Sequence, residues 1–506
     1  MRSKKAFINI ISSLLLQVFT VVCGFIVPKL IIKNFGSNVN GLVTSITQFL
    51  AYITLLESGF GPVVKSVLYK PIANKEKNKI EEILKASERF FRVISYIFII
   101  YIIILCIVLP IILENEFNNL YTFSLVAIMA ISLFAEYYFG MTYRLFLQAD
   151  QKTYIISVIH IVTLILNTIM VVLLIYMKTS IQVVKLASAL IYIVRPILLN
   201  LYVKKKYNIN IKNAKLGYKI KQKWDGLAQH IAFVVHSNTD VVILTLFSNS
   251  TEVSVYSVYL LVVSGVRNLV CSLMGGVEAS FGNMIAQDEK EVLNKNFKSY
   301  EGFYHTISTI IFISTLFLIM PFVRIYTKGI IDADYIRPVF AYLIVLAEFI
   351  WAIRQPYNEL IKVAGHFKET NKGAWIEAIS NIVISIILVW NFGIVGVAIG
   401  TLVTMFIRTI EFMYHSSKYI LKRNIWYTFK RLFVIAVEGG IVACIVNNMP
   451  LIEVTEYSTW AIQSFIVGMI SAIVVLTINC IVYRENIKKI IEIAKNIFKK
   501  EKIENN

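Results

Sequence analysis

Charged side chains lie inside long apolar stretches of this chain, where each of them needs a physical explanation. An ionisable group within membrane hydrocarbon is costly, so it usually faces water, a ligand or an opposite charge. A structural ion pair or snorkelling to the surface explains any single one of them. The set as a whole predicts a water-filled cleft, and it comprises Lys29, Glu57, Lys65, Glu136, Arg144, Arg195, Asp240, Arg267, Glu278, Glu348, Arg354, Glu377, Arg408, Glu411 and Glu438.

The cations of this set are residue types that bind phosphate groups. Lys and Arg hold a diphosphate by charge-assisted hydrogen bonds, and Arg often does so in bidentate fashion. Arg267 is the strongest candidate, because it lies in the middle of an apolar stretch with no carboxylate near it in sequence. Lys29 and Lys65 can also reach the membrane surface by snorkelling. We predict that an anionic substrate binds to Arg267, Lys65, Lys29, Arg195 and Arg408.

A second group of polar residues has the chemistry of an ion-coupling site. Asp240 follows Asn238 and Thr239, and a carboxylate beside amide and hydroxyl oxygens can hold Na⁺ or carry a proton. The same groups would also serve an interhelical hydrogen-bond cluster. Glu57 and Glu278 either act as coupling carboxylates or pair with Arg or Lys. The predicted ion-coupling residues are Asp240, Asn238, Glu57 and Glu278, with Na⁺ or H⁺ as the ion and no bound cofactor.

The two carboxylates Glu57 and Glu278 occupy corresponding places in a segment that is written twice. The two copies are Leu56-Glu57-Ser58-Gly59-Phe60-Gly61 and Val277-Glu278-Ala279-Ser280-Phe281-Gly282. Further echoes in the same order are Ala135-Glu136-Tyr137 with Ala347-Glu348-Phe349, and Arg195 after Ala149 with Arg408 after Ala364. A membrane chain made of two similar halves usually works at the interface between them, which points to transport.

The composition places these residues in transmembrane helices. The chain has 506 residues, 57% of them hydrophobic, and a mean hydropathy of +0.69. Apolar stretches of roughly 20 residues recur from end to end, as transmembrane helices require. We predict an all-α integral membrane protein with about fourteen such helices, at 7–32, 41–68, 88–113, 120–146, 153–177, 181–203, 226–247, 253–286, 299–323, 336–361, 371–391, 394–415, 428–448 and 458–483.

The net charge of +19 is concentrated in alternate connections between these stretches. The densest cluster of lysines begins with Lys204-Lys205-Lys206, whereas the intervening connections are short and often acidic. The positive-inside rule therefore puts both termini in the cytoplasm of a multi-pass membrane protein. The predicted parts are an N-terminal lobe of six helices (1–203), a basic cytoplasmic linker (204–225), a C-terminal lobe of six helices (226–420), two further helices (421–483) and a basic amphipathic tail (484–506).

Several other functions find no support in the sequence. Binding of nucleic acid would need a folded soluble module, and no stretch offers one. The five cysteines and six histidines are not spaced as metal ligands, so no metal site is predicted. A membrane enzyme such as a polymerase or transferase would need a nucleophile and base on a substantial loop. No catalytic residues are therefore predicted, and the chain is not expected to be an enzyme.

With these features, the chain resembles the polysaccharide-exporter branch of the multidrug/oligosaccharidyl-lipid/polysaccharide exporter superfamily. The residues that carry the resemblance are Asn34-Phe35-Gly36, Asn40-Gly41-Leu42, Glu57-Ser58-Gly59-Phe60-Gly61, Asn238-Thr239-Asp240, Ala364-Gly365-His366, Phe392-Gly393-Ile394-Val395-Gly396 and Gly400-Thr401. They are spread over most of the chain. Members often have Gly after the Ala that corresponds to Ala149, whereas this chain has Asp150.

The resemblance implies two six-helix lobes around a central cationic cavity, with two additional helices. It implies a flippase that carries an undecaprenyl-diphosphate-linked oligosaccharide from the inner to the outer leaflet of the bacterial plasma membrane by alternating access. The expected partners are this lipid-linked oligosaccharide, membrane lipids, a polysaccharide polymerase and glycosyltransferases. Two alternatives with the same fold stay open, namely a cation-coupled multidrug antiporter and a lipid II flippase.

Overall fold

The computed structural model describes residues 2–57, 60–209, 211, 227–272, 277–450 and 452–484. These residues form helices and no strand, which confirms the predicted all-α class. In chain order the longer helices are α1 (Arg2–Phe35), α2 (Ser37–Ala51), α5 (Lys77–Ile112), α6 (Asn119–Ala135), α8 (Thr153–Tyr176), α9 (Ile181–Tyr207), α10 (Leu227–Phe247), α11 (Ser250–Cys271), α13 (Lys290–Tyr326), α14 (Pro338–Ala364), α15 (Asn371–His415), α16 (Trp426–Asn448) and α17 (Tyr457–Val482).

The shorter elements are α3 (Thr54–Glu57), α4 (Phe60–Ala73), the π-helix η1 (Glu136–Gly140), α7 (Met141–Ala149), α12 (Val277–Ala286) and the π-helix η4 (Ser416–Ile420). Most of the predicted basic linker 204–225, nearly all of the predicted tail 484–506, and the repeat residues Ser58 and Gly59 lie outside the described residues.

Twelve of the helices in the described part of the chain are long and apolar enough to cross a membrane. One of them, residues 371–420, covers two of the predicted segments, and α16 is not among the twelve. The count of about fourteen crossings therefore stays a prediction. On α5, the side chains of Ile100, Ile103 and Ile107 are 60%, 55% and 58% exposed. Such an outward apolar stripe is what a lipid-facing helix presents.

Contacts divide the chain into two compact units. Unit 1 comprises residues 1–257 and 329–333, and unit 2 comprises residues 258–328 and 334–506. Helix α10 and the first residues of α11 therefore group with the N-terminal part of the chain, whereas the predicted C-terminal lobe began at residue 226. Both units place short helices directly before a long one, α3 and α4 before α5 in unit 1 and α12 before α13 in unit 2.

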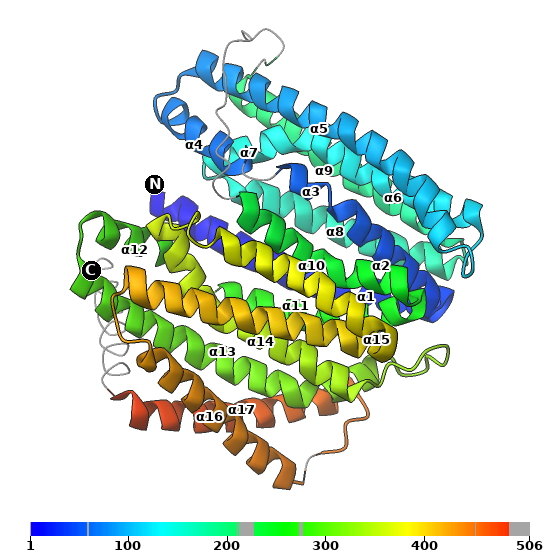
Figure 1. The fold of residues 1–506 in the computed structure, drawn as a ribbon. Coiled ribbons are helices and arrows are strands. Elements are labelled where there is room, and N and C mark those ends of the chain that lie inside the picture. The colour runs from blue at the N-terminus through cyan, green and yellow to red at the C-terminus, as the bar shows by residue number, and fades with distance from the viewer. Residues whose placement is uncertain are drawn as a thin grey trace. The chain divides into compact units, whose positions relative to one another are not determined.

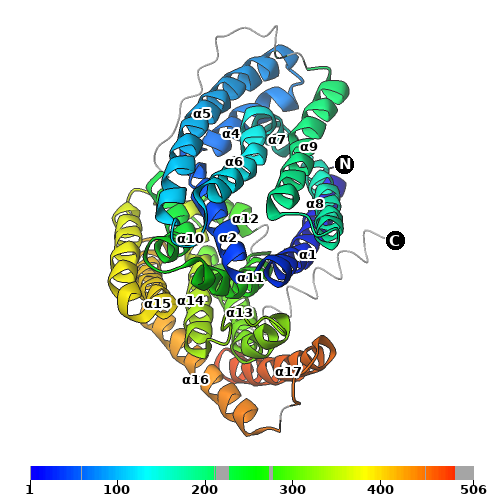
Figure 2. The ribbon, with the colours of Figure 1, turned by 90° about the vertical axis from the view of Figure 1, so that its right-hand side faces the viewer.

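In unit 1, α8 packs between α1 and α9, and α6 packs against α5 and α9 (Figures 1 and 2).

Two helix ends in unit 1 show ordinary capping chemistry. The Asn118 side chain accepts a 2.9 Å hydrogen bond from the backbone N–H of Leu120 and so caps α6. Asn208, which ends α9, adopts a left-handed conformation with φ of 51°, as is common after a helix.

A close approach of two helices explains Gly41 in unit 1. A Cβ atom on Gly41 of α2 would overlap the backbone carbonyl of Ser250, the first residue of α11. The neighbouring Asn40 donates hydrogen bonds to Ser254 and Ser257 of α11, at 2.9 and 3.2 Å. Because only glycine allows this approach, Gly41 and Asn40 together fix how α2 lies against α11.

In unit 2, α15 contains a sharp break at Gly393, whose φ and ψ are 53° and −130°. The parts on either side run antiparallel, because Gly396 meets Leu388, and Gly400 meets Ser385. The predicted helices 371–391 and 394–415 correspond to these two parts. Glycine suits the break because its missing Cβ permits a positive φ.

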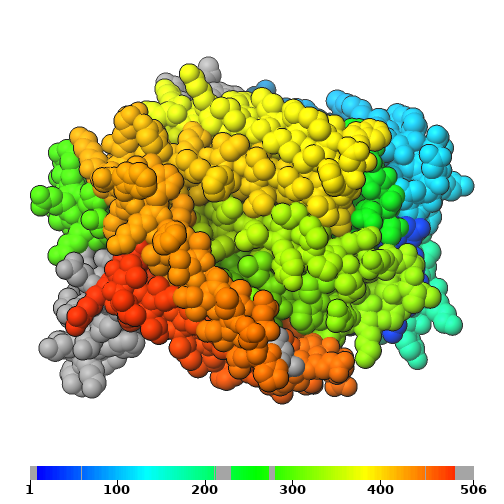
Figure 3. Space-filling view, turned by 60° about the horizontal axis from the view of Figure 1, so that its bottom comes forward, coloured from blue at the N-terminus to red at the C-terminus, as the bar shows by residue number. Residues whose placement is uncertain are grey.

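The helices α16 and α17 complete unit 2. They pack on each other and on α13, and Figure 3 shows them in orange and red on the face turned toward the viewer. Their shared core consists of Ile313 and Leu318 of α13 with Val442, Val446, Val467 and Val475. The two C-terminal helices are thus held by apolar packing against a helix of the same unit.

Candidate functional site

Arg267, the cation ranked first by sequence, has a carboxylate partner in unit 2. Its guanidinium lies 3.2 Å from Glu348 of α14 and 5.4 Å from the centre of the Trp351 ring, one turn further along α14. The Arg267 side chain is 22% exposed, and that of Glu348 only 9%. The ion pair and the ring hold the cation in place, while the Arg267 side chain stays partly exposed.

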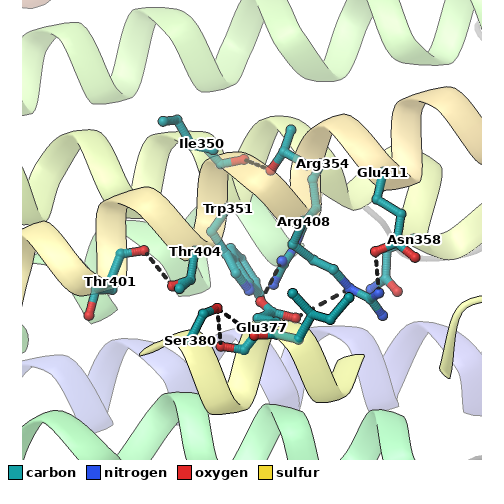
Figure 4. A network of polar contacts seen from close by, with 12 residues as sticks. Ile350, Trp351, Arg354, Asn358, Glu377, Ser380, Thr401, Thr404, Arg408 and Glu411 are labelled. Carbon is teal, nitrogen blue, oxygen red and sulfur yellow. Dashed lines mark hydrogen bonds and ion pairs between the residues drawn. The ribbon is translucent and has the colours of Figure 1, made fainter. Parts of the chain in front are cut away.

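Arg408 lies in the same unit, but in a more buried group of charges (Figure 4). It lies 3.3 Å from one oxygen of Glu377, whose other oxygen accepts a 2.7 Å hydrogen bond from Arg354. A second ion pair of 2.5 Å joins Arg408 to Glu411. Only 1% of the Arg408 side chain is exposed, and its guanidinium stacks 4.2 Å from the Phe412 ring. These contacts make Arg408 a structural residue rather than an open anion site.

The two groups form one series of alternating charge, because Glu348 also interacts electrostatically with Arg354. We call the series the charge ladder, and its six members in order are Arg267, Glu348, Arg354, Glu377, Arg408 and Glu411. Three arginines and three glutamates give it no formal net charge. Its two end residues are the more exposed ones, and the four residues between them are buried. Neutral pairing of this kind allows charges to lie inside a membrane protein.

Beside the Arg408–Glu411 end of the ladder is a cavity of about 240 Å³. Lys372, Glu377, Arg408 and Glu411 supply its polar lining. A Cβ atom on Gly373 would overlap the Arg408 and Glu411 side chains, so the glycine makes room for their ion pair. At this cavity Glu411, whose side chain is 32% exposed, is the more accessible member of the pair.

In unit 1, Arg195 of α9 has a different environment. It donates a 2.7 Å hydrogen bond to the Thr163 hydroxyl of α8, and its guanidinium lies 4.2 Å from the Tyr192 ring centre. It also interacts electrostatically with Glu136 and Arg144, which form an ion pair of 3.5 Å. The half-buried cation therefore has no carboxylate at ion-pair distance among the described residues, although Glu136 partly compensates its charge.

The other predicted cations of unit 1 lie on separate helices. Lys29 follows Pro28 in α1, and Lys65 lies on the short α4; both are partly exposed. Partial exposure is what snorkelling side chains show. Their role in substrate binding stays a prediction.

The predicted ion-coupling residues differ in burial. Asp240 is 5% exposed in α10 and accepts a 2.8 Å hydrogen bond from Tyr256 of α11. The preceding Thr239 lies 3.1 Å from the Tyr52 hydroxyl of α2, and Asn238 donates to the Val234 carbonyl in its own helix. A buried carboxylate among hydroxyls suits either a bound cation or a proton. Among the described residues, no group of three or more His, Cys, Asp and Glu side chains could hold a metal ion.

Glu57 and Glu278, which occupy corresponding places in the repeat, have unlike surroundings. Glu57 is half-buried at the end of α3 and accepts a 3.2 Å hydrogen bond from Tyr137 in η1. Glu278 is exposed in the first turn of α12. The Glu57–Tyr137 contact supports a local structural role for Glu57, and the coupling role of both carboxylates stays a prediction.

One buried ion pair was not predicted from the sequence. Arg423, in the segment between α15 and α16, makes two hydrogen bonds of 2.9 and 2.7 Å to Glu301 of α13, which is fully buried. Burial alone would lower the pKa of Arg423, but the Glu301 carboxylate raises it above its ordinary value. Tyr357 donates a further hydrogen bond to Glu301. The sequence carried one signal, because Ser87-Glu88-Arg89-Phe90 follows the first copy of the repeat and Tyr300-Glu301-Gly302-Phe303 follows the second.

Comparison with known proteins then places this fold. No known protein family and no curated protein matches the sequence. The solved structure of the lipid II flippase MurJ, in an inward closed conformation, matches with a TM-score of 0.67 at 17% identity, over 95% of this chain and 100% of that chain. The fold is that of MurJ and the MATE transporters.

Two further solved structures, both of MOP superfamily transporters, also match. An inward-facing multidrug resistance MATE family transporter of the MOP superfamily matches with a TM-score of 0.54 at 12% identity, over 80% of this chain and 94% of that chain. A MOP superfamily transporter from Pyrococcus furiosus matches with a TM-score of 0.52 at 13% identity, over 83% and 97%. The predicted all-α membrane-protein fold is confirmed. With twelve apolar helices in the part of the chain that the structure describes, the chain is a multi-pass membrane protein.

Proposed function

We propose that this chain is a flippase that moves undecaprenyl-diphosphate-linked oligosaccharide repeat units from the inner to the outer leaflet of the bacterial plasma membrane. The translocated units would serve synthesis of a surface polysaccharide. The observation that carries the proposal is the extent of the likeness to the lipid II flippase MurJ, which covers 95% of this chain and the whole of that one. The MATE structure covers 80% of this chain at a lower TM-score.

The chemistry of the cargo explains why a protein is needed. A diphosphate and a chain of sugars lose their hydration in hydrocarbon, which makes unassisted crossing very unfavourable. A transporter replaces that hydration with charged and polar side chains, while the lipid tail can stay in the membrane. The helices with ionisable groups are the elements of this chain that supply such side chains.

Within this proposal, Arg267 binds the diphosphate. Its guanidinium is oriented by Glu348 and Trp351, and the Arg267 side chain is partly exposed. A diphosphate offers several oxygens at once and competes with the single Glu348 carboxylate for the same N–H groups. The Glu348 charge stays compensated when Arg267 turns to the substrate, because Arg354 also interacts with it. The ladder thus allows Arg267 to exchange Glu348 for a diphosphate at a low cost in free energy.

Energy for net transport would come from Na⁺, H⁺ or the membrane potential. Asp240 is our candidate for the coupling group, because it is buried and has the hydroxyls of Tyr256 and Thr239 near it. We also propose that both termini are cytoplasmic, since the basic clusters alternate with acidic connections along the sequence. Glycosyltransferases would then act before the flippase, and a polysaccharide polymerase would act after it.

Two alternatives have support of their own. The MATE likeness favours a cation-coupled multidrug antiporter, and the MurJ likeness equally fits a flippase for lipid II itself. A drug antiporter should confer resistance to cationic dyes, whereas a lipid II flippase should be needed for growth of the cell. A repeat-unit flippase should do neither.

Deletion of the gene tests the proposal. Complete lipid-linked repeat units should accumulate on the cytoplasmic face, and the surface polysaccharide should be lost while cells keep growing. Normal amounts of these units on both faces would count against it and favour drug export. Units that are found outside but unpolymerised would favour a membrane enzyme.

A further inference from the structure

A cavity in unit 2 lies away from the charge ladder, where α13 ends and α17 begins. Its volume is about 480 Å³, within the range of roughly 300–1,000 Å³ that small-molecule sites occupy. The wall comes from the last turns of α13, from the segment 452–455 and from one residue inside α17. Its lining has two cations, Arg324 and Lys328, and two hydrogen-bond acceptors, Glu453 and Gln463.

The two cations are available for a ligand. Arg324 lies in the last turn of α13 and Lys328 two residues beyond the helix, and both side chains are exposed. Neither forms an ion pair with a carboxylate among the residues that the structure describes. Two cations that line one cavity without a partner are the arrangement that binds a phosphate group.

Gln463 supplies a second, independent observation. Its side chain is only 4% exposed, and it lines the cavity from inside α17. The Oε1 atom accepts no hydrogen bond from any described residue. A buried acceptor without a donor is unfavourable by about 1–3 kcal/mol in proteins generally, so a ligand that brings a donor would gain from it. The Glu453 carboxylate is a further acceptor on the same cavity.

The surroundings of the cavity are those of a membrane–water interface. The Trp460 side chain donates a 3.1 Å hydrogen bond to the Leu318 carbonyl, and its ring lies 5.3 Å from Phe322. Tyr457, the first residue of α17, lies 6.4 Å from Phe322. Trp and Tyr are enriched at the level of lipid headgroups. Both helices that border the cavity have an end there, where the chain leaves an apolar span.

We propose that this cavity binds a phosphodiester that also carries a hydrogen-bond donor, which is the chemistry of a phosphatidylethanolamine or phosphatidylglycerol headgroup. The phosphate contacts Arg324 and Lys328, and the ammonium or hydroxyl donor reaches Gln463 and Glu453. The site is independent of the transported substrate, because none of its residues belongs to the charge ladder. A lipid bound there holds the end of α13 to the start of α17.

The test uses the purified full-length protein, stripped of lipid in detergent, and measures lipid binding by native mass spectrometry. Phosphatidylethanolamine and phosphatidylglycerol should bind more tightly than phosphatidylcholine, whose quaternary ammonium cannot donate a hydrogen bond. The double variant Arg324→Gln/Lys328→Gln should bind both donor lipids about tenfold more weakly or worse. A matched control, Lys178→Gln/Lys430→Gln, removes two exposed cations that do not line the cavity and should bind like the unchanged protein.

The variant Gln463→Met separates the role of the acceptor. It keeps a side chain of similar length and should weaken the preference for phosphatidylethanolamine over phosphatidylcholine, since Glu453 remains as the second acceptor. If this buried substitution prevents folding, the exposed pair Arg324 and Lys328 still tests the site. Equal binding by the unchanged protein, the double variant and its control would overturn the proposal, as would equal affinity for phosphatidylcholine and phosphatidylethanolamine.

Soluble glycerophosphoethanolamine distinguishes the two sources of such a ligand. If the ligand is a membrane lipid, the soluble headgroup should compete only at concentrations far above those of the lipid. Competition at equal concentration would support the same phosphodiester chemistry and assign the site to a free metabolite. No competition at any concentration, together with lipid binding that the double variant retains, would show that only the acyl chains are bound and would overturn the proposal.

Discussion

Arg267 of α11 donates a hydrogen bond to Glu348 of α14 across 3.2 Å, although 81 residues separate them in sequence. The pair begins the charge ladder, which continues through Arg354, Glu377 and Arg408. Because the ladder alternates in sign, each of its two buried carboxylates, Glu348 and Glu377, has a cation on either side of it. When a ligand binds Arg267 in place of Glu348, the Glu348 charge is still compensated by Arg354. This property links the structure of the lobe to the proposed binding of an anionic head group.

The first prediction concerns Arg267→Ala. It should reduce export of lipid-linked repeat units by about 10- to 100-fold, because charge-assisted hydrogen bonds to the diphosphate are worth roughly 1.5–3 kcal/mol. Arg267→Lys keeps the charge but loses the bidentate geometry and should retain part of the activity. Cell-surface polysaccharide and membrane protein level are measured together.

Arg92→Ala is the control, since Arg92 also pairs with a glutamate, Glu88, at 2.8 Å but lies on the exposed side of α5. It should export normally. Full export by Arg267→Ala at a normal protein level would remove Arg267 from the binding site.

The second prediction concerns Glu377, which lies between two arginines. Glu377→Ala leaves Arg354 and Arg408 buried without their shared carboxylate and should lower the free energy of unfolding by about 3–5 kcal/mol. Unfolding of the purified protein in detergent is followed with increasing denaturant. For comparison, Lys362→Ala breaks an exposed ion pair with Glu359 and should change the free energy by about 1 kcal/mol or less. Similar effects of the two substitutions would show that the ladder does not stabilise the lobe.

The third prediction concerns the helix contact at Gly41. Gly41→Ala should force α2 away from the Ser250 carbonyl and destabilise the protein by about 1–3 kcal/mol. Gly440→Ala is the matched substitution, because no heavy atom lies within 4 Å of the added Cβ in α16. It should be neutral or stabilise the helix by up to about 1 kcal/mol. Thermal unfolding of both variants is compared, and an unaffected Gly41→Ala protein would exclude the close contact.

Some features of the fold could be predicted from the sequence alone. Apolar stretches predicted the helices, because their length and composition reflect the membrane itself. The boundary between the predicted helices 371–391 and 394–415 was placed correctly as well: the helix break lies at Gly393, where a positive φ favours a residue without Cβ. Local chemistry explains both successes, since each depends on neighbouring residues only.

Ion pairs between residues that are far apart in sequence could not be predicted from local patterns. Arg267 has no carboxylate near it in sequence, whereas in the fold Glu348 lies 3.2 Å from it. Arg423 and Glu301 are 122 residues apart, and nothing local marks them as partners. Packing of helices decides which charges meet, and packing depends on the whole chain rather than on any one segment.

The fourth prediction concerns coupling. Asp240→Asn keeps the size of the side chain and a hydrogen-bond partner for Tyr256, but it removes the charge. It should abolish the dependence of transport on an Na⁺ or H⁺ gradient while the protein stays folded. Asp288→Asn is the control, because Asp288 is an exposed residue that pairs with Lys290 at 2.8 Å. If Asp240→Asn transports with unchanged ion dependence, the buried carboxylate only holds helices together.

Reconstitution of the purified protein into liposomes tests the central claim most directly. The liposomes contain an undecaprenyl-diphosphate-linked oligosaccharide, and a glycosidase or lectin outside reports how much of it reaches the outer leaflet. We predict translocation by the unchanged protein under an ion gradient, little by Arg267→Ala, and none of a cationic dye. Translocation of the dye without the glycolipid, or equal glycolipid translocation with and without protein, would contradict the account.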